Sequence, residues 1–184
     1  MTDEHLIELA RAGNSVAIVA LYEQHKQQLF QHLYYQLGDA HTAEDLTTEV
    51  FMRAIQHLHR FRAGEGTVKA WLFRIARNLA IDQQRKGQGR LHVSLLDDHQ
   101  DGAPSPYELV EHTLSVDALY AALQRLTAEQ REVIVLRFID DLSIAEAAQV
   151  MNKTDSAIKN LQLRALKALQ RLLTHEAPIY EYAK

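Results

Sequence analysis

The residues of this sequence that are best suited to chemistry are cations on one side of a predicted helix over residues 155–173. At about 100° per residue, apolar side chains centred on Ile158 form a stripe to be buried, and the opposite side is polar and basic. The stripe consists of Ile158, Leu161, Ala165, Leu169, Leu172 and Leu173, with Gln162 at a partly wet edge. The basic side carries Arg171 and the residues that we call the duplex set, Ser156, Lys159, Asn160, Leu163, Arg164 and Lys167.

The duplex set has the side chains that sequence-specific binding of duplex DNA requires. Cations contact phosphates, small polar groups reach base edges, and Leu163 is able to meet a thymine methyl in the major groove. The alternative is an ordinary solvated basic face.

A short corner before this helix favours the DNA interpretation. Ser143 and Glu146 form an S-x-x-E capping box that begins the preceding helix, and Thr154 is a suitable N-cap for the next one. Asn152 tolerates the left-handed conformation that such a corner often needs. These features predict a helix-turn-helix.

A second basic helix is predicted over residues 68–86. Val68, Leu72, Ile75, Ala76 and Leu79 form its core side. Cations lie roughly opposite, with Trp71 at the border, and a Gly-rich loop with an aromatic and an arginine precedes the helix. We call the polar and aromatic residues of both segments the single-strand set: Phe61, Arg62, Trp71, Arg74, Arg77, Asn78 and Arg85.

A cationic groove beside an aromatic side chain is typical of single-stranded nucleic-acid binding, and the loop could shape a pocket for an unstacked base. The alternatives are that Trp71 is a core residue, that the arginines only keep the surface soluble, and that the loop is a plain turn.

An acidic helix is predicted from Thr42, as its N-cap, to Leu58. Its core side carries Ala43, Val50, Phe51, Ala54 and Leu58. Its outer side carries Asp45, Glu49, Met52 and Gln56, with Arg53 beside them. Acidic groups beside an exposed methionine favour a protein partner over DNA, and a solvated acidic face is the alternative.

The overall composition agrees with a soluble, intracellular, all-α protein. The 184 residues include 7 Gly, 3 Pro and no Cys, which excludes disulfides and cysteine-based zinc sites. The formal net charge of −4 conceals two basic segments, because residues 53–90 carry nine Lys and Arg against two Asp and Glu, and residues 143–173 carry five against two. Such asymmetry indicates nucleic-acid binding.

Glycine, proline and acidic residues gather between the two basic segments, which predicts two small helical domains joined by a flexible acidic linker. We place the first domain at residues 1–88, the linker at 89–116, the helix-turn-helix domain at 117–174 and a tail at 175–184. No segment has the length or apolarity of a membrane span or the form of a signal peptide, so a cytoplasmic location is expected.

Three segments, in this order, resemble bacterial sigma factors. AEDLTTEVFMRAIQHL is similar to their core-polymerase-binding region, and WLFRIARNLAIDQQRK is similar to their promoter-melting helix. LTAEQREVIVLRFIDDLSIAEAAQVMNKTDSAIKNLQLRALKAL is similar to their C-terminal domain. No other sigma region lies between them, so the resemblance is to the short extracytoplasmic-function class, over about residues 10–173.

The resemblance implies a non-enzymatic protein without cofactor or metal, which binds the clamp and flap regions of core RNA polymerase, promoter DNA and an anti-sigma factor. It implies that bases of the minus-ten element are captured and flipped by Arg74 and Asn78 with the loop at 60–67. It places Lys159, Asn160, Leu163 and Arg164 against the minus-thirty-five duplex. It implies a polymerase set on the acidic helix, consisting of Asp45, Leu46, Glu49, Phe51 and Met52.

Other function classes remain open. A helix-turn-helix regulator that binds only duplex DNA, without being a polymerase subunit, would leave the acidic helix and the Trp71 helix without a role. A helical enzyme is one such class, but the sequence has no P-loop, G-x-S-x-G, H-E-x-x-H or C-x-x-C motif. The pair His57 and His59 has no third metal ligand nearby. A simple interaction adaptor is the remaining class.

Overall fold

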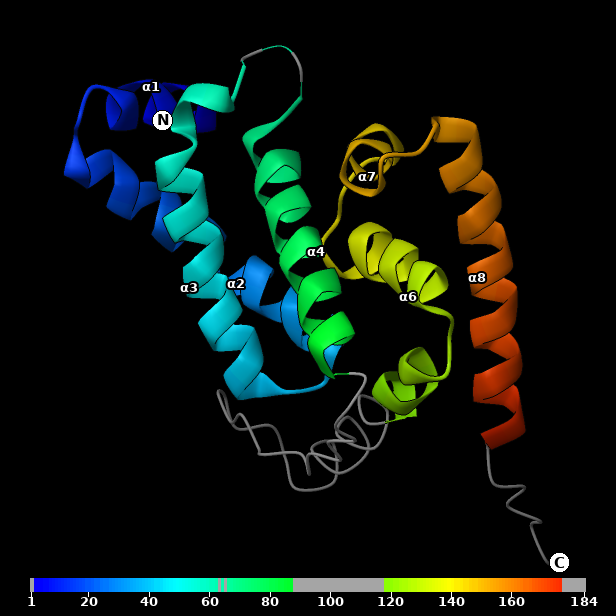
Figure 1. Cartoon of the computed structure of the whole chain (residues 1–184). Coiled ribbons are helices and arrows are strands. Elements are labelled where there is room, and N and C mark those ends of the chain that lie inside the picture. The colour runs from blue at the N-terminus through cyan, green and yellow to red at the C-terminus, as the bar shows by residue number, and fades with distance from the viewer. Residues whose placement is uncertain (1, 63, 65, 88–117, 177–184) are drawn as a thin grey trace, which may run out of the picture.

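The computed structural model describes residues 2–62, 64, 66–87 and 118–176, and these residues form helices and turns without a strand, which confirms the all-α prediction. The N-terminal half comprises α1 (Asp3–Arg11), α2 (Ser15–Leu37), α3 (Ala40–Gln56), the single turn η1 (Leu58–Arg60) and α4 (Val68–Gly87). The C-terminal half comprises a helical segment over 118–124, α6 (Ala128–Ile134), the π-helical turn η2 (Val135–Ile139), α7 (Ile144–Met151) and α8 (Asp155–Glu176) (Figure 1). The predicted linker lies outside the described residues, as do residues 177–184 of the predicted tail.

The predicted corner of the helix-turn-helix is confirmed. Ser143 and Glu146 form both hydrogen bonds of the capping box, at 3.2 and 2.8 Å. Asn152 is left-handed, with φ 52° and ψ 50°, and the Thr154 hydroxyl accepts a hydrogen bond from the Ala157 amide at 3.2 Å. Local side-chain chemistry is therefore enough to begin and end these helices.

Two local predictions were wrong. Helix α3 is capped by Asp39, whose carboxylate accepts a hydrogen bond from the Thr42 amide at 2.7 Å, so Thr42 lies inside the first turn. A carboxylate is favoured there because it satisfies a free amide and faces the positive end of the helix. Leu173 is 36% exposed and lies outside the buried stripe of α8, because its neighbours in this last part of the helix are also exposed or half-buried.

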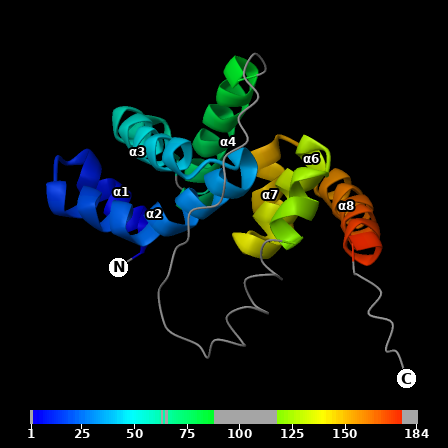
Figure 2. The ribbon, with the colours of Figure 1, turned by 90° about the horizontal axis from the view of Figure 1, so that it is seen from below.

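The two halves pack directly against each other. A single hydrophobic cluster includes Leu33 and Phe73 of the first half and Leu123, Leu136 and Ile158 of the second. Both views place α4 between α3 and the C-terminal half, with α8 on the outer side (Figures 1 and 2). Within the described ranges, no helix is both long and apolar enough to cross a membrane.

Replacement of Gly38 by alanine should destabilise this packing more than the same change at Gly13. Both glycines are left-handed, with φ 78° and 85°, but only at Gly38 would the new methyl group collide with another residue, the Tyr120 hydroxyl. We expect Gly13→Ala to cost about 1 kcal/mol of unfolding free energy, and Gly38→Ala distinctly more. Urea unfolding measures both. Adding Tyr120→Phe should recover part of the Gly38→Ala loss, and equal losses at both glycines would contradict the predicted collision.

Candidate nucleic-acid interface

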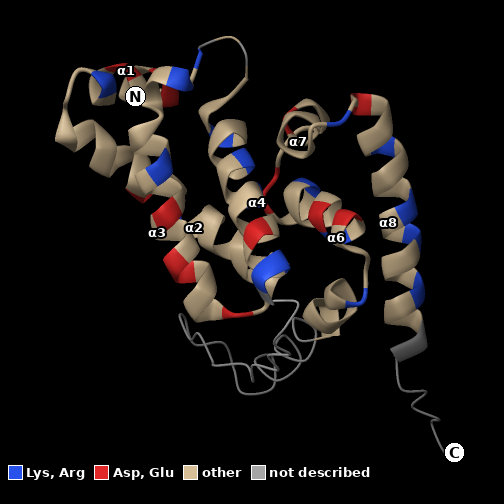
Figure 3. Ribbon diagram, in the orientation of Figure 1, with Lys and Arg blue, Asp and Glu red and all other residues tan. Residues whose placement is uncertain are grey.

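The duplex set lies on the exposed side of α8. All six of its side chains are exposed, and Leu163 is 54% exposed although it is apolar. The opposite side of α8 packs on α6 and α7 through Ile158 and Ala165, which are fully buried. Figure 3 shows Lys and Arg recurring along α8. The helix therefore presents a continuous basic ridge that is free to enter a groove.

The corner before α8 is tied to α6 by an ion pair. The Lys153 ammonium lies 2.8 Å from the Glu129 carboxylate, and its hydrogen bond lowers the pKa of Glu129 below the ordinary value. Because this pair is partly exposed, its main effect is to orient the corner, and its stabilising energy is small.

The single-strand set is only partly accessible. Arg62, Arg74, Asn78 and Arg85 are exposed. The aromatic members are buried: Phe61 is 5% exposed and Trp71 is 9% exposed, and their ring centroids lie 5.6 Å apart. This burial agrees with the alternative that Trp71 is a core residue. Contact of the two rings with DNA stays a prediction.

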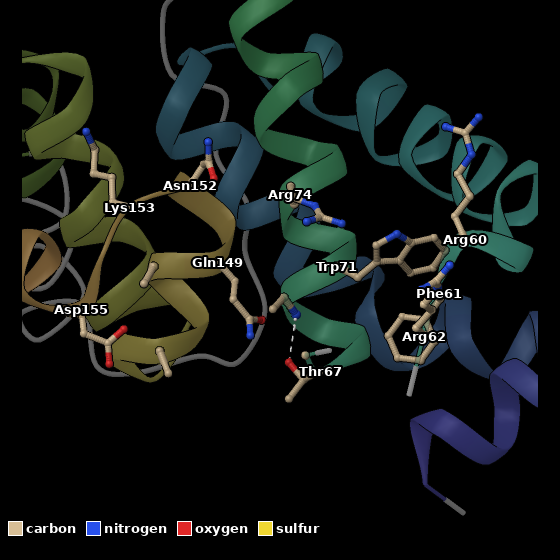
Figure 4. A pocket seen from close by; sticks show the side chains of 14 residues that line it. Arg60, Phe61, Arg62, Thr67, Trp71, Arg74, Gln149, Asn152, Lys153 and Asp155 are labelled. Carbon is tan, nitrogen blue, oxygen red and sulfur yellow. Dashed lines mark hydrogen bonds between the residues drawn. The ribbon is translucent and has the colours of Figure 1, made fainter. Parts of the chain in front are cut away.

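A polar cavity of about 460 Å³ lies between the loop at 60–67, the first turns of α4, and α7 with its corner. Its cationic lining residues are Arg60, Arg62, Arg74 and Lys153. In Figure 4, Trp71 and Arg74 project from α4 on one side, and Gln149 and Asn152 come from α7 and its corner on the other. Four members of the single-strand set, Phe61, Arg62, Trp71 and Arg74, therefore line the same open cavity as the helix-turn-helix.

The polymerase set lies on α3, away from this cavity. Asp45 and Met52 are exposed, and Leu46 and Glu49 are half-buried. Glu49 pairs with Arg53 at 2.7 Å on the same helix. Phe51 is only 7% exposed and packs edge-on against Tyr22 of α2, with 4.8 Å between ring centroids. Phe51 is therefore a core residue that attaches α3 to α2, which confirms its predicted place on the core side of the helix. Its role in polymerase binding, implied by the resemblance, stays a prediction.

A buried polar contact joins the two halves. His32 of α2 and Asp140, just after η2, form a hydrogen bond of 2.7 Å between Nδ1 and Oδ2, and both side chains are 1% exposed. Burial raises the pKa of Asp140, although His32 acts in the opposite direction. The Lys69 ammonium of α4 donates to the Asp140 backbone oxygen at 2.5 Å.

A second polar contact engages a member of the single-strand set. The Arg77 guanidinium of α4 donates to the carboxylate of Glu132 in α6, which is 8% exposed. Burial raises the pKa of Glu132, while the neighbouring Arg77 lowers it. We call His32, Lys69, Arg77, Glu132 and Asp140 the interdomain latch. Arg77 and Lys69 both lie on α4, so the C-terminal half engages one member of the single-strand set and a second cation of the same helix.

Sequence reasoning missed this latch, although one signal for it was present. Glu132 and Asp140 lie at either end of the apolar run "VIVLRFI", where a carboxylate is costly unless it finds a partner. Their partners are 55 and 108 residues away in the sequence, and only the fold brings them together.

Family models match in chain order: Sigma-70 region 2 over residues 21–90 and Sigma-70, region 4 over residues 117–169. The ECF RNA polymerase sigma factor BldN of Streptomyces coelicolor is 41% identical over 174 residues, which are 94% of this chain and 66% of BldN. The ECF RNA polymerase sigma factor SigX of Bacillus subtilis is 38% identical over 158 residues, which are 82% of this chain and 80% of SigX.

Solved structures agree. CnrH, in complex with the cytosolic domain of CnrY, is 26% identical with a TM-score of 0.75, over 95% of this chain and 99% of CnrH. The sigma factor RpoE from Bartonella quintana, in complex with the anti-sigma factor NepR, is 28% identical with a TM-score of 0.65, over 82% of this chain and 92% of RpoE. Two sigma regions in order, with a relative matched over most of its length, show that this chain belongs to the extracytoplasmic-function RNA polymerase sigma factors of the sigma-70 family.

Proposed function

We propose that this sigma factor binds core RNA polymerase through α3, directs it to a class of promoters and assists opening of the duplex. In this assignment residues 1–88 bind polymerase and the minus-ten element, residues 117–174 bind the minus-thirty-five element, and residues 89–116 link them. The accessible cations of the single-strand set and the duplex set would carry the two DNA contacts. The role requires no catalytic residue or cofactor, and it places the chain in the cytoplasm with polymerase and DNA.

The observation that carries this proposal is the presence of three different surfaces on one small chain. They are the basic ridge on α8, the cations on α4 with its preceding loop, and the acidic, methionine-bearing side of α3. A regulator that binds only duplex DNA would use the first surface alone. A sigma factor uses all three. Each of its DNA contacts binds weakly by itself, and the two select a promoter together only when polymerase holds both of them.

The packed arrangement of the two halves supports a closed form that must open on the promoter. Elements centred near −10 and −35 lie about 25 base pairs apart, roughly 85 Å along B-form DNA at about 3.4 Å per base pair. Helix α4 packs on α7, and α7 packs on α8, so in this arrangement the DNA surfaces of α4 and α8 are too close together to reach both elements at once. We infer that polymerase separates the halves when it binds them.

An anti-sigma partner fits the same picture. CnrH and RpoE were solved in complex with CnrY and NepR, and their chains superpose on most of this one. We propose that an anti-sigma factor binds the closed form of this chain and keeps the halves together.

Transcription in vitro with core polymerase on a genomic DNA library, followed by sequencing of the start sites, tests the proposed function. We expect the chain to create a set of new start sites that share two upstream elements. Start sites identical to those of the bare core enzyme would reject the proposal. Tight and specific duplex binding by the free chain, with no effect on polymerase, would favour the duplex-only regulator.

Arg164→Ala should weaken promoter-specific initiation without changing core binding. Arg164 is exposed near the middle of the α8 ridge, and loss of a good base or phosphate contact costs about 1–3 kcal/mol. We therefore expect roughly tenfold less initiation at promoters that retain the minus-thirty-five element. Arg171→Ala, two turns further along the same helix, is the matched control and should have a smaller effect. Unchanged promoter selectivity would remove Arg164 from the duplex set.

A further inference from the structure

Arg11, the last residue of α1, reaches across to the backbone that leads into the cavity. Its guanidinium donates twice to the Leu58 carbonyl oxygen, from Nε at 3.0 Å and from Nη2 at 2.8 Å. Nη2 also donates to the Phe61 carbonyl oxygen. One side chain therefore holds both ends of the Leu58–Phe61 turn.

Arg11 adds to the bonding of one of these carbonyl groups and caps the other. The Leu58 oxygen already accepts the Phe61 amide at 3.2 Å, which closes the turn, whereas the Phe61 carbonyl lies just beyond the single 3₁₀ turn and has no partner within it. A cation is especially suitable, because the C-terminal end of a helical turn carries partial negative charge and charge-assisted hydrogen bonds are stronger than neutral ones.

Helix α1 holds Arg11 rigidly. Leu6, Ile7 and Ala10 are buried against the rest of the first domain. At the other end of α1, the Asp3 carboxylate accepts a hydrogen bond from Gln24 at 2.6 Å and lies 2.9 Å from His25 Nε2. The Sigma-70 region 2 match begins only at residue 21, so α1 lies outside it and yet supports a turn inside it.

The turn leads directly to the residues that line the cavity. Phe61 packs on Trp71, Arg62 follows it, and Arg60 precedes it. Because Arg11 fixes the backbone on either side of Arg60, it determines the direction in which the loop leaves η1. Binding of a flexible strand benefits when the receiving groups are already in place.

We infer that Arg11 is a positioning residue for capture of the unpaired minus-ten strand, and that α1 is the platform that carries it. This inference rests on the proposed function. It concerns selection of the strand, whereas the polymerase contact on α3 is independent of it.

The test uses holoenzyme and two fork-junction DNAs, one with the minus-ten sequence of a promoter found in the transcription experiment and one with that sequence scrambled. The measured quantity is the ratio of the two affinities, which does not depend on how much of the protein is active. We expect Arg11→Gln to lower this ratio about tenfold, as expected for lost hydrogen bonds to a charged group, while affinity for core polymerase stays the same.

Two further variants make the result specific. Arg11→Lys keeps the charge but loses the planar fork, so its ratio should lie between those of the wild type and Arg11→Gln. Lys26→Gln removes a partly exposed cation of α2, which pairs with Glu23, and it should leave the ratio unchanged. A wild-type ratio in Arg11→Gln would overturn the inference alone, and absence of any preference in wild-type holoenzyme would overturn the proposed function as well.

Discussion

Reversal of the charges of Asp45 and Glu49 should abolish binding of this chain to core RNA polymerase. Both residues lie on the outer side of α3 beside the exposed Met52, one helical turn apart. A partner surface that binds these two carboxylates must be positively charged. Two arginines in their place would be repelled by it. Each unpaired charge in an interface costs several kcal/mol, so we expect at least about a hundredfold loss of affinity in a pull-down or titration with core enzyme.

The double variant Asp45→Arg, Glu49→Arg should remain folded. The pair that it removes, between Glu49 and Arg53, is a partly exposed pair on one helix and contributes only about 0.5 kcal/mol. The double variant Glu4→Arg, Glu8→Arg is a matched control, because it makes the same change with the same spacing on the exposed side of α1. If the α3 variant still co-purifies with core polymerase as the control does, α3 is not the docking surface.

Replacement of Glu132 by arginine should drive the two halves of the free chain apart. Glu132 is 8% exposed and accepts a hydrogen bond from the Arg77 guanidinium across the interface between the halves. The variant would therefore bury two cations against each other. Loss of one member of a buried pair typically costs about 3–5 kcal/mol, which corresponds to at least a hundredfold shift toward the open form. The opened chain should also bind a single-stranded minus-ten oligonucleotide more tightly, because Arg77 is released.

Distance measurement by fluorescence energy transfer can follow this opening. The chain contains no cysteine, so Gln56→Cys on α3 and Gln170→Cys on α8, both exposed positions, provide two unique attachment sites for dyes. Glu132→Arg should lower the transfer efficiency, and addition of Arg77→Glu should restore it by re-forming the pair with exchanged charges. Equal efficiencies in the wild type and both variants would show that this contact does not hold the halves together.

Features that depend on neighbouring residues could be predicted from the sequence. The capping box at Ser143 and Glu146, the left-handed Asn152 and the N-cap at Thr154 each involve groups within a few residues of one another. The basic ridge on α8 follows from helical periodicity alone once its buried stripe is known. The N-cap of α3 was predicted at Thr42 but lies at Asp39, because both residue types are good N-caps and only the path of the chain selects between them.

Burial of individual aromatic residues could not be predicted in the same way. Trp71 lies at the border between the two sides of its helix, and Phe61 is in an irregular loop, so periodicity does not decide whether either is exposed. The structure packs them against each other. Phe51, by contrast, lies on the core side of its helix by periodicity, and the structure packs it against Tyr22. A side chain at the edge of a helical face is buried or exposed according to which neighbour covers it.

The sequence by itself determined that this chain is helical, where its basic and acidic faces lie, and how its helix-turn-helix corner is built, because these follow from contacts within a few residues. Only the tertiary structure decided that the halves pack together, that Glu132 and Asp140 find Arg77 and His32, and that Arg11 holds the turn at Leu58. These pairs are 47 to 108 residues apart in the sequence. Their charged or polar groups meet only where distant segments pack together, and no local periodicity in the sequence encodes that packing.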